Sequence, residues 1–240
     1  MTEDRHERVA GILGGMGPEA TVDLLRRIIR NTPARDDQDH IRCLVDINPK
    51  IPSRIKRLLE GGGEDPGPVL ADMARRLEAW GADFLVMACN TAHNYYADVR
   101  DAVSVPVLNM IELAIREAAR LAPGGVAGIL ASPAVRLTGL YGVLCTALGL
   151  TPLYAEAQWE QRLLQVIRDV KAGCTGGPVR TAFAEIVAHV RGKGANVLII
   201  ACTELGVIGA QADIPLVDAA DVLARAVVDT AKGRTPLPTA

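Results

Sequence analysis

The chain contains the stretch GADFLVMACNTAH at Gly81–His93 and a second stretch of the same design, GANVLIIACTE, at Gly194–Glu204. Each begins with Gly, Ala and one polar residue, continues through four apolar residues, and reaches Ala-Cys followed by polar residues. A short apolar run that ends in helix-capping residue types is typical of a buried parallel strand leading into a helix. We therefore expect Cys89 and Cys202 each at the carboxyl end of a strand, beside the start of a helix.

A second pair of matching stretches indicates that half of the chain is duplicated. The segment VAGIL occurs at Val9–Leu13 and again at Val126–Leu130. Strands alternate with helical patterns in both halves, which predicts an α/β fold of two similar domains with central parallel sheets, related by a pseudo-two-fold axis. We expect residues 1–112 to form the first half, with helix 218–231 packing back on it, and residues 113–217 the second. The two cysteines would then face each other across a cleft, where ligands bind in such folds.

Composition excludes several classes of protein. The chain has 240 residues, a net charge of −2 and only 3% aromatic residues, so we expect no nucleic-acid partner. No apolar run approaches the roughly 20 residues of a membrane-spanning helix, so we expect no membrane partner either. Five cysteines occur without a CxxC pair, which argues against a zinc site or a disulfide scaffold and favours the cytoplasm. Three of them have no partner in the other half and are interpreted as structural: Cys43, Cys145 and Cys174.

The glycine-rich segment after the first predicted strand, GGMGPEAT at Gly14–Thr21, allows three interpretations. It fits loosely the dinucleotide-binding pattern, but the acidic residue that this pattern needs at a later strand end is not where it should be. An anion-binding loop, or a tight turn that needs glycine, explains the residues equally well. Pro18 suits the first position of the helix that follows.

Three capping and catalytic roles are predicted from local sequence. Ser53 is suited to cap a helix that begins at Arg54, and Asn90 and Thr91 to cap the helix after Cys89. His93 in that helix is either a base partner of Cys89 or a residue with local hydrogen bonds.

Two facing thiols suit one kind of chemistry. A helix start favours the thiolate, whereas a single cysteine in an apolar strand is more often a small core residue; both interpretations stay open for each cysteine alone. Together, a thiolate could remove a proton from one face of a carbon acid while a thiol returns one to the opposite face, inverting the carbon. Backbone N–H groups at the helix starts, with Asn90, Thr91 and Thr203, could hold the substrate α-carboxylate. No metal cluster or pyridoxal lysine motif stands out, so we expect no cofactor.

Several of these motifs, in this order, resemble the aspartate racemases of the aspartate/glutamate racemase superfamily. The motifs are Gly14–Pro18, Asn48–Arg54 (NPKIPSR), Cys89–His93 and Cys202–Glu204, and the resemblance covers about residues 9–228. It implies a pyridoxal-independent, two-cysteine racemase with its site between two similar α/β domains, usually a homodimer, acting on a small acidic amino acid. By the same resemblance, Cys89 and Cys202 are the acid/base pair, Arg54 and Lys171 hold the side-chain carboxylate, and the other substrate-binding residues are Met16, Asn90, Thr91, Thr203 and Glu204.

The sequence also indicates alternatives. Glutamate racemases of the superfamily carry His after Cys-Thr, whereas this chain carries Glu204, so that subgroup is disfavoured. Racemisation of glutamate or of a broader set of amino acids remains an alternative. A third possibility is a module that binds an acidic amino acid without turnover, although a binding site has no need of two opposed thiols.

Overall fold

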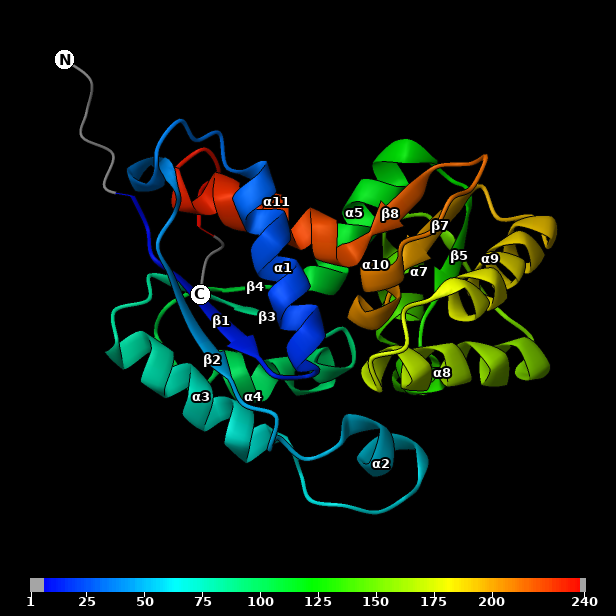
Figure 1. Ribbon diagram of the computed structural model, residues 1–240, viewed down its shortest axis with the longest axis horizontal. Coiled ribbons are helices and arrows are strands. Elements are labelled where there is room, and N and C mark those ends of the chain that lie inside the picture. The colour runs from blue at the N-terminus through cyan, green and yellow to red at the C-terminus, as the bar shows by residue number, and fades with distance from the viewer. Residues whose placement is uncertain (1–6, 238–240) are drawn as a thin grey trace.

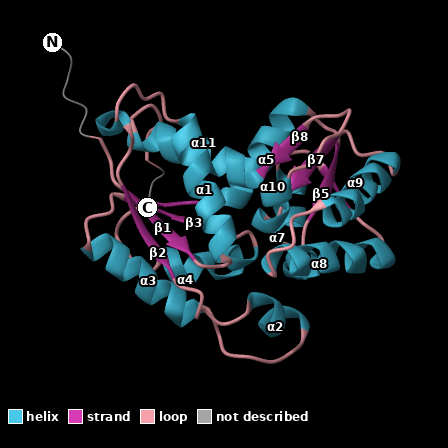
Figure 2. Cartoon of the chain, in the orientation of Figure 1, coloured by secondary structure: helices cyan, strands magenta, loops and turns pink. Residues whose placement is uncertain are grey.

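The computed structural model describes residues 7–237, which form two parallel sheets flanked by helices (Figures 1 and 2). None of the helices in this range is long and apolar enough to cross a membrane. The elements of the first half are β1 (Ala10–Gly14), α1 (Pro18–Asn31), β2 (Cys43–Ile47), α2 (Arg54–Leu59), α3 (Gly67–Ala79), β3 (Phe84–Met87), α4 (Tyr96–Arg100), β4 (Val107–Leu108) and α5 (Met110–Leu121). Those of the second half are β5 (Val126–Leu130), α6 (Pro133–Thr138), α7 (Leu140–Ala147), β6 (Thr151–Tyr154), α8 (Ala157–Lys171), α9 (Gly177–Gly192), β7 (Val197–Ile200), α10 (Thr203–Ile208), β8 (Leu216–Asp218) and α11 (Ala219–Ala231).

The two sheets have the same topology. The strand order is β2-β1-β3-β4 in the first and β6-β5-β7-β8 in the second, and every pairing is parallel. The registers also match, because Leu13 lies opposite Met87 in the first sheet and Leu130 opposite Ile200 in the second. The predicted α/β fold with two similar parallel-sheet halves is therefore confirmed.

The glycine in each copy of VAGIL has a packing reason. A Cβ atom on Gly11 would lie 2.5 Å from the side chain of Leu85 and 2.8 Å from that of Ala82. A Cβ atom on Gly128 would lie 2.7 Å from Leu198 and 3.1 Å from Ala195, the corresponding residues of the second half. Both strands thus need glycine because the next strand and its preceding turn approach the backbone closely.

The repeated Gly-Ala-polar sequence before β3 and β7 also forms the same turn in both halves. Gly81 and Gly194 adopt positive φ angles of 97° and 99°, the left-handed region that glycine enters without steric cost. The polar residue then ties the turn to the central strand. The Asp83 carboxylate accepts from the N–H of Val9, and the Asn196 side-chain oxygen accepts from the N–H of Val126. The sequence repeat is therefore a repeat of backbone interactions.

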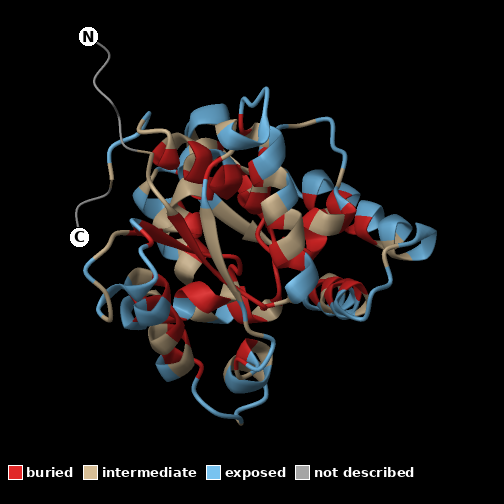
Figure 3. Cartoon of the chain, turned by 60° about the vertical axis from the view of Figure 1, so that its left-hand side comes forward, coloured by how far each residue is buried: buried red, intermediate tan, exposed pale blue. Residues whose placement is uncertain are grey.

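Buried apolar residues form three clusters, two local and one shared. Figure 3 colours the chain by burial and shows buried residues along the strands and on one side of the helices. One local cluster packs α3 against the outer face of the first sheet, and the other packs α8 and α9 against the outer face of the second. The shared cluster includes residues of both central strand pairs and joins the halves. The two sheets therefore have one continuous core between them.

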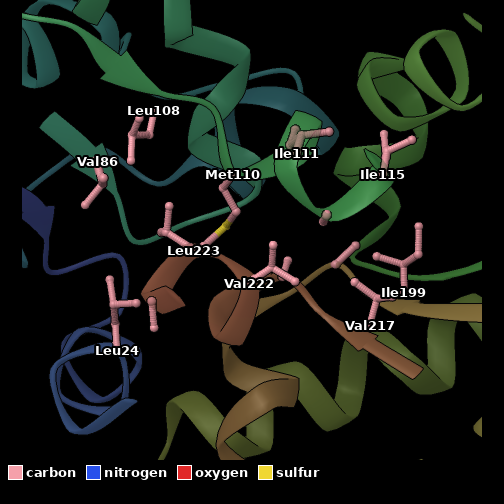
Figure 4. Packing of buried hydrophobic residues seen from close by; sticks show 14 of the residues in the cluster. Leu24, Val86, Leu108, Met110, Ile111, Ile115, Ile199, Val217, Val222 and Leu223 are labelled. Atoms are coloured by element: carbon pink, nitrogen blue, oxygen red, sulfur yellow. The ribbon is translucent and has the colours of Figure 1, made fainter. Parts of the chain in front are cut away.

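This shared core arises because the halves exchange a helix. Helix α5 ends the first half but packs against α7, β7 and β8 of the second, while α11 ends the second half and packs against α1 of the first. Figure 4 shows Ile111 and Ile115 of α5 near Ile199 and Val217, and Leu223 of α11 between Leu24 and Val86. The predicted boundary after residue 112 falls in the first turn of α5, and the division into domains stays a prediction.

Candidate active site

Cys89 and Cys202 follow the central strands β3 and β7 directly, at equivalent ends of the two sheets. The residue before each is fixed by the same backbone bond: Ala88 N–H donates to the carbonyl of Leu13, and Ala201 N–H donates to that of Leu130. Both cysteines are buried, with 6% and 8% of their surface exposed. They line one cavity, which thus has a thiol from each half.

The cavity brings together eight of the nine residues predicted for the site. They are Arg54, Cys89, Asn90, Thr91, Lys171, Cys202, Thr203 and Glu204. The exception is Met16, which is fully buried in the core cluster of the first sheet and does not line the cavity. Its apolar side chain is held by that core, so the expectation that Met16 contacts the substrate finds no support in the geometry.

Glu204 holds the thiol of Cys202. The Cys202 Sγ–H donates to Glu204 Oε2 over 3.2 Å, and the N–H of Gly17 donates to Oε1 over 3.2 Å. Lys171 Nζ lies 3.5 Å from the same Oε1. Because the carboxylate is only 5% exposed and has these partners, it is fixed beside the thiol rather than extended into the cavity.

The helix start was one of two interpretations left open for Cys202, and its effect on the thiol is outweighed in the structure. Burial raises the pKa of the Cys202 thiol well above its ordinary value, and the Glu204 carboxylate raises it further, while Lys171 opposes the shift. Helix α10 has only six residues, so its dipole does not offset the lost solvation and the adjacent negative charge. The raised pKa favours the thiol form of Cys202, which is the form that can donate to Glu204.

Lys171 carries the positive charge from the second half. It ends α8, and 36% of its side chain is exposed. Burial lowers the pKa of its ammonium group, but the negative charge of Glu204 is the main opposing effect and the net pKa is raised. The group therefore stays protonated at the cavity wall.

Arg54 carries the positive charge from the first half. Ser53 caps α2 by accepting from the N–H of Lys56, as predicted, and Arg54 is the first residue of that helix. Its Nη1 donates to the carbonyls of Ile51 and Pro52, whereas its Nε is buried without a partner within residues 7–237. A buried guanidinium with a free donor is suited to bind an anion.

His93 has local hydrogen bonds rather than a role as base partner of the Cys89 thiol. Its Nε2 accepts from the N–H of Met110 over 3.1 Å, so Nδ1 carries the proton and donates to the carbonyl of Cys89 over 2.9 Å. Burial lowers the His93 pKa to about 4, which keeps the ring neutral. The ring thus ties the Cys89 turn to the start of α5.

The prediction that Asn90 and Thr91 cap a helix is wrong. Neither side chain caps the segment after Cys89, which is a 3-10 helix over Thr91–Tyr95. Asn90 Oδ1 instead accepts from the hydroxyl of Tyr141 over 2.6 Å, and Thr91 Oγ1 lies 3.4 Å from Ser132 Oγ. Both contacts cross from the first half to the second, so tertiary partners replace the local ones.

The structure also accounts for the glycine-rich segment. Gly15 has a φ of +89°, and a Cβ atom there would lie 2.4 Å from the backbone of Asn48. The following Gly17 directs its N–H to Glu204, and Pro18 is the first residue of α1, as predicted. A tight turn with close backbone approach therefore explains these glycines, and its polar contact is to the chain's own carboxylate.

Several residues of the site were not predicted from the sequence. Ser53, Ile55, Ser132 and Ile167 also line the cavity, and Tyr141 contacts Asn90 from behind. Ser132 had a signal, because Ala131-Ser132-Pro133 follows the second VAGIL segment just as the glycine-rich segment follows the first. Ser53 lies in the Asn48–Arg54 motif but was predicted only as a helix cap, and the other three lie outside the quoted motifs.

The three remaining cysteines differ from one another. Cys145 is buried and Cys43 is partly buried, and burial raises the pKa of each thiol to about 11. Cys174 is exposed. A packing role therefore suits Cys43 and Cys145. It does not suit Cys174, because that side chain is exposed.

Comparison with known proteins agrees with this arrangement. The model of the Asp/Glu/Hydantoin racemase family matches residues 13–227, which include both cysteines and every strand from β2 to β8. The chain belongs to this family. It is an amino-acid racemase by family. Its two cysteines lie at equivalent ends of the duplicated sheets.

Individual racemases are similar over nearly the whole chain. The broad specificity amino-acid racemase RacX of Bacillus subtilis is 29% identical over 230 residues, covering 92% of this chain and 96% of the relative. The structure of Picrophilus torridus aspartate racemase is also 29% identical, with a TM-score of 0.83 and 96% of each chain covered. An aspartate racemase homologue from Pyrococcus horikoshii, 20% identical with a TM-score of 0.75 over 94% of this chain and 99% of that one, shares the fold.

Proposed function

We propose that the protein racemises aspartate by a two-base mechanism in which Cys89 and Cys202 act on opposite faces of Cα. The observation that carries the proposal is the shared cavity, which has one buried thiol from each half. A carbon acid held between two such groups can lose a proton to one and gain a proton from the other.

The proposed steps conserve protons and charge. With Cys202 as the thiol, Cys89 acts as thiolate, removes the α-proton of one enantiomer and becomes a thiol. The carbanion then takes the Cys202 proton on the opposite face, which leaves Cys202 as a thiolate and forms the other enantiomer. Exchange of protons with solvent restores the starting state, or the product reacts in the reverse direction. No cofactor is expected in this scheme.

The charges at the cavity favour an acidic substrate. Arg54 and Lys171 approach from different halves, and both side chains line the cavity. In the proposal they bind the side-chain carboxylate, while Asn90, Thr91 and Thr203 bind the α-carboxylate, on which negative charge develops. The similarity to Picrophilus torridus aspartate racemase supports this assignment.

A broader substrate range is the second candidate. It is favoured by the similarity to RacX, whose name describes a broad-specificity racemase. The position of Glu204 is compatible with both candidates, because its carboxylate is occupied by Cys202, Gly17 and Lys171 and adds no selectivity of its own. A homodimer in the cytoplasm remains our expectation for either.

Proton NMR of L-aspartate with the purified protein in D2O, without added pyridoxal, tests the proposal. We expect the α-proton signal to disappear while D-aspartate accumulates. Disappearance without inversion would rule out the two-base mechanism. No exchange with aspartate, but exchange with other amino acids, would rule out aspartate as the substrate.

The variant Arg54→Ala separates the two candidates. If Arg54 binds the side-chain carboxylate, the variant should raise KM for aspartate roughly 100-fold, the size of a lost charged hydrogen bond. KM for any neutral substrate should change little. The matched control is Arg57→Ala, which removes an exposed arginine of the same short helix. Equal effects on acidic and neutral substrates would favour the broad-specificity candidate.

A further inference from the structure

One fully buried tyrosine contacts the site from the opposite half of the molecule. Tyr141 lies in α7, has no exposed surface, and belongs to the shared core. Its hydroxyl donates to Asn90 Oδ1 over 2.6 Å. Burial raises the pKa of Tyr141 well above its ordinary value, so the hydroxyl keeps the proton that it donates.

This hydrogen bond fixes which end of the Asn90 amide is free. Asn90 is 2% exposed and lines the cavity, and its Nδ2 is buried without a hydrogen-bond partner within residues 7–237. If the amide were turned over, Tyr141 would have to accept from Nδ2 and its own proton would be left without that acceptor. A buried donor without a partner is costly, so its presence beside a cavity indicates a ligand acceptor.

We propose that Tyr141 is a positioning residue: it holds the Asn90 amide so that Nδ2 donates to a carboxylate oxygen of the bound amino acid. The identity of that ligand rests on the proposed function. Tyr141 itself does not line the cavity and acts only through Asn90.

The contact also makes this donor depend on both halves. Asn90 follows β3 of the first sheet, whereas Tyr141 belongs to the helix pair after β5 of the second. The amide is therefore oriented for binding only when the halves are together as in this structure. Thr91 and Ser132 make a second polar contact between the same two regions.

A double-mutant cycle tests the role of Tyr141 in turnover. We expect Tyr141→Phe to lower kcat/KM about tenfold and Asn90→Ala about a hundredfold, with the double variant no worse than Asn90→Ala alone. The matched control is Tyr154→Phe, which removes a buried hydroxyl that lies against Gly142, and it should leave kcat/KM unchanged. Losses that multiply in the double variant would show that Tyr141 acts independently of Asn90 and would overturn the proposal.

Amide NMR of the ligand-free protein separates this proposal from the proposed function. The side-chain NH2 signals of Asn90, assigned by their loss in Asn90→Ala, should shift or broaden in Tyr141→Phe and stay in place in Tyr154→Phe. Unmoved signals in Tyr141→Phe would overturn the positioning role whatever the substrate is. A shift in a protein that racemises no amino acid would uphold the positioning of the amide and reject the proposed function alone.

If Tyr141→Phe does not fold, Asn90→Asp replaces it. That variant keeps an acceptor for the tyrosine hydroxyl but offers the ligand no donor. Retained folding with weaker binding of aspartate by about tenfold or more supports the proposal, and unchanged binding overturns it.

Discussion

The Cys89 and Cys202 turns begin identically and then diverge. Each follows the central strand of its sheet, after an alanine held by the same backbone bond. After Cys89 the chain forms a 3-10 helix, and the neutral His93 ring fixes the turn. After Cys202 it forms a short α-helix whose second residue, Glu204, accepts a hydrogen bond from the thiol.

The divergence continues one turn later. Counting from the cysteine, the position of His93 is taken by Gly206 in the second half. There Arg27 of α1 donates to the carbonyl of Gly206 over 2.9 Å and pairs with Asp218 over 2.9 Å. A Cβ atom on Gly206 would lie 3.0 Å from that carboxylate, so the missing side chain makes room for the ion pair.

The two cysteines occupy equivalent positions of the duplicated sheets, and the residues that follow each cysteine make the surroundings of the two thiols unequal. Glu204 accepts the Cys202 proton, whereas no carboxylate within the described residues 7–237 hydrogen bonds to Cys89. Opposite faces of a substrate would therefore meet thiols with different hydrogen-bond partners.

The largest effect is expected from removing either thiol. Cys89→Ala and Cys202→Ala should each lower the racemisation rate by about 10³-fold or more, because each direction needs both a base and an acid. In D2O, each variant should still exchange the α-proton of one enantiomer, and the two variants should prefer opposite enantiomers. Cys145→Ala, which removes a buried thiol outside the cavity, is the control. A racemisation rate near that of the control in either variant would rule out the two-base mechanism.

A smaller effect is expected from Glu204→Gln, which makes the two thiols more alike. Glu204 raises the pKa of Cys202, so its removal lowers that pKa. In the direction in which Cys202 donates a proton, activity needs its thiol form, so the alkaline limb of the pH profile should move to lower pH. We expect kcat/KM near neutral pH to fall by about tenfold.

The control for this variant is Glu19→Gln, which removes an exposed carboxylate from the neighbouring surface depression and not from the thiol. Its pH profile should match that of the unmodified protein. An alkaline limb that stays in place in Glu204→Gln would show that the Cys202 thiol form does not limit the rate at high pH.

The smallest effect on turnover is expected where the halves are alike. Gly11→Ala and Gly128→Ala each place a Cβ atom within 2.6 Å of a neighbouring side chain, which should cost roughly 1–3 kcal/mol of unfolding free energy in both cases. Gly62→Ala is the control, because its Cβ atom would meet nothing within 4 Å. Urea unfolding measures the three values. Clearly different losses of unfolding free energy in Gly11→Ala and Gly128→Ala would show that β1 and β5 are not packed equivalently.

Sequence reasoning located the strands, the duplication and both cysteines, because these depend on short-range patterns. The run Phe84–Met87 is apolar throughout, and glycine and a polar residue mark its start in both halves. The positions of Arg54 and Glu204 followed from the resemblance in their motifs. Both residues line the cavity, while their roles with substrate stay predictions.

The errors concern residues whose partners are distant in the chain. Asn90 was expected to cap a helix, but a tyrosine 51 positions later competes for its side chain. For Cys202, a thiolate favoured by the helix start and a plain core cysteine were both left open, and burial together with Glu204 raises the pKa of its thiol. Met16 belongs to the core cluster of the first sheet and does not line the cavity, so its contact with substrate stays a prediction. The amphipathic pattern of α5 likewise does not say which of two sheets it covers.

Because α5 and α11 each pack on the other half, the chain cannot be divided into two halves that each keep a complete core. Helix α5 of the first half packs on the second half, and α11 of the second half packs on the first. A half produced alone would therefore expose apolar residues such as Ile199 and Val217. A single-copy precursor with this topology would be complete only as a pair of chains, each lending its last helix to the other. Joining two copies in one gene then allows what a symmetric pair cannot have: two cysteines at equivalent positions with different neighbours.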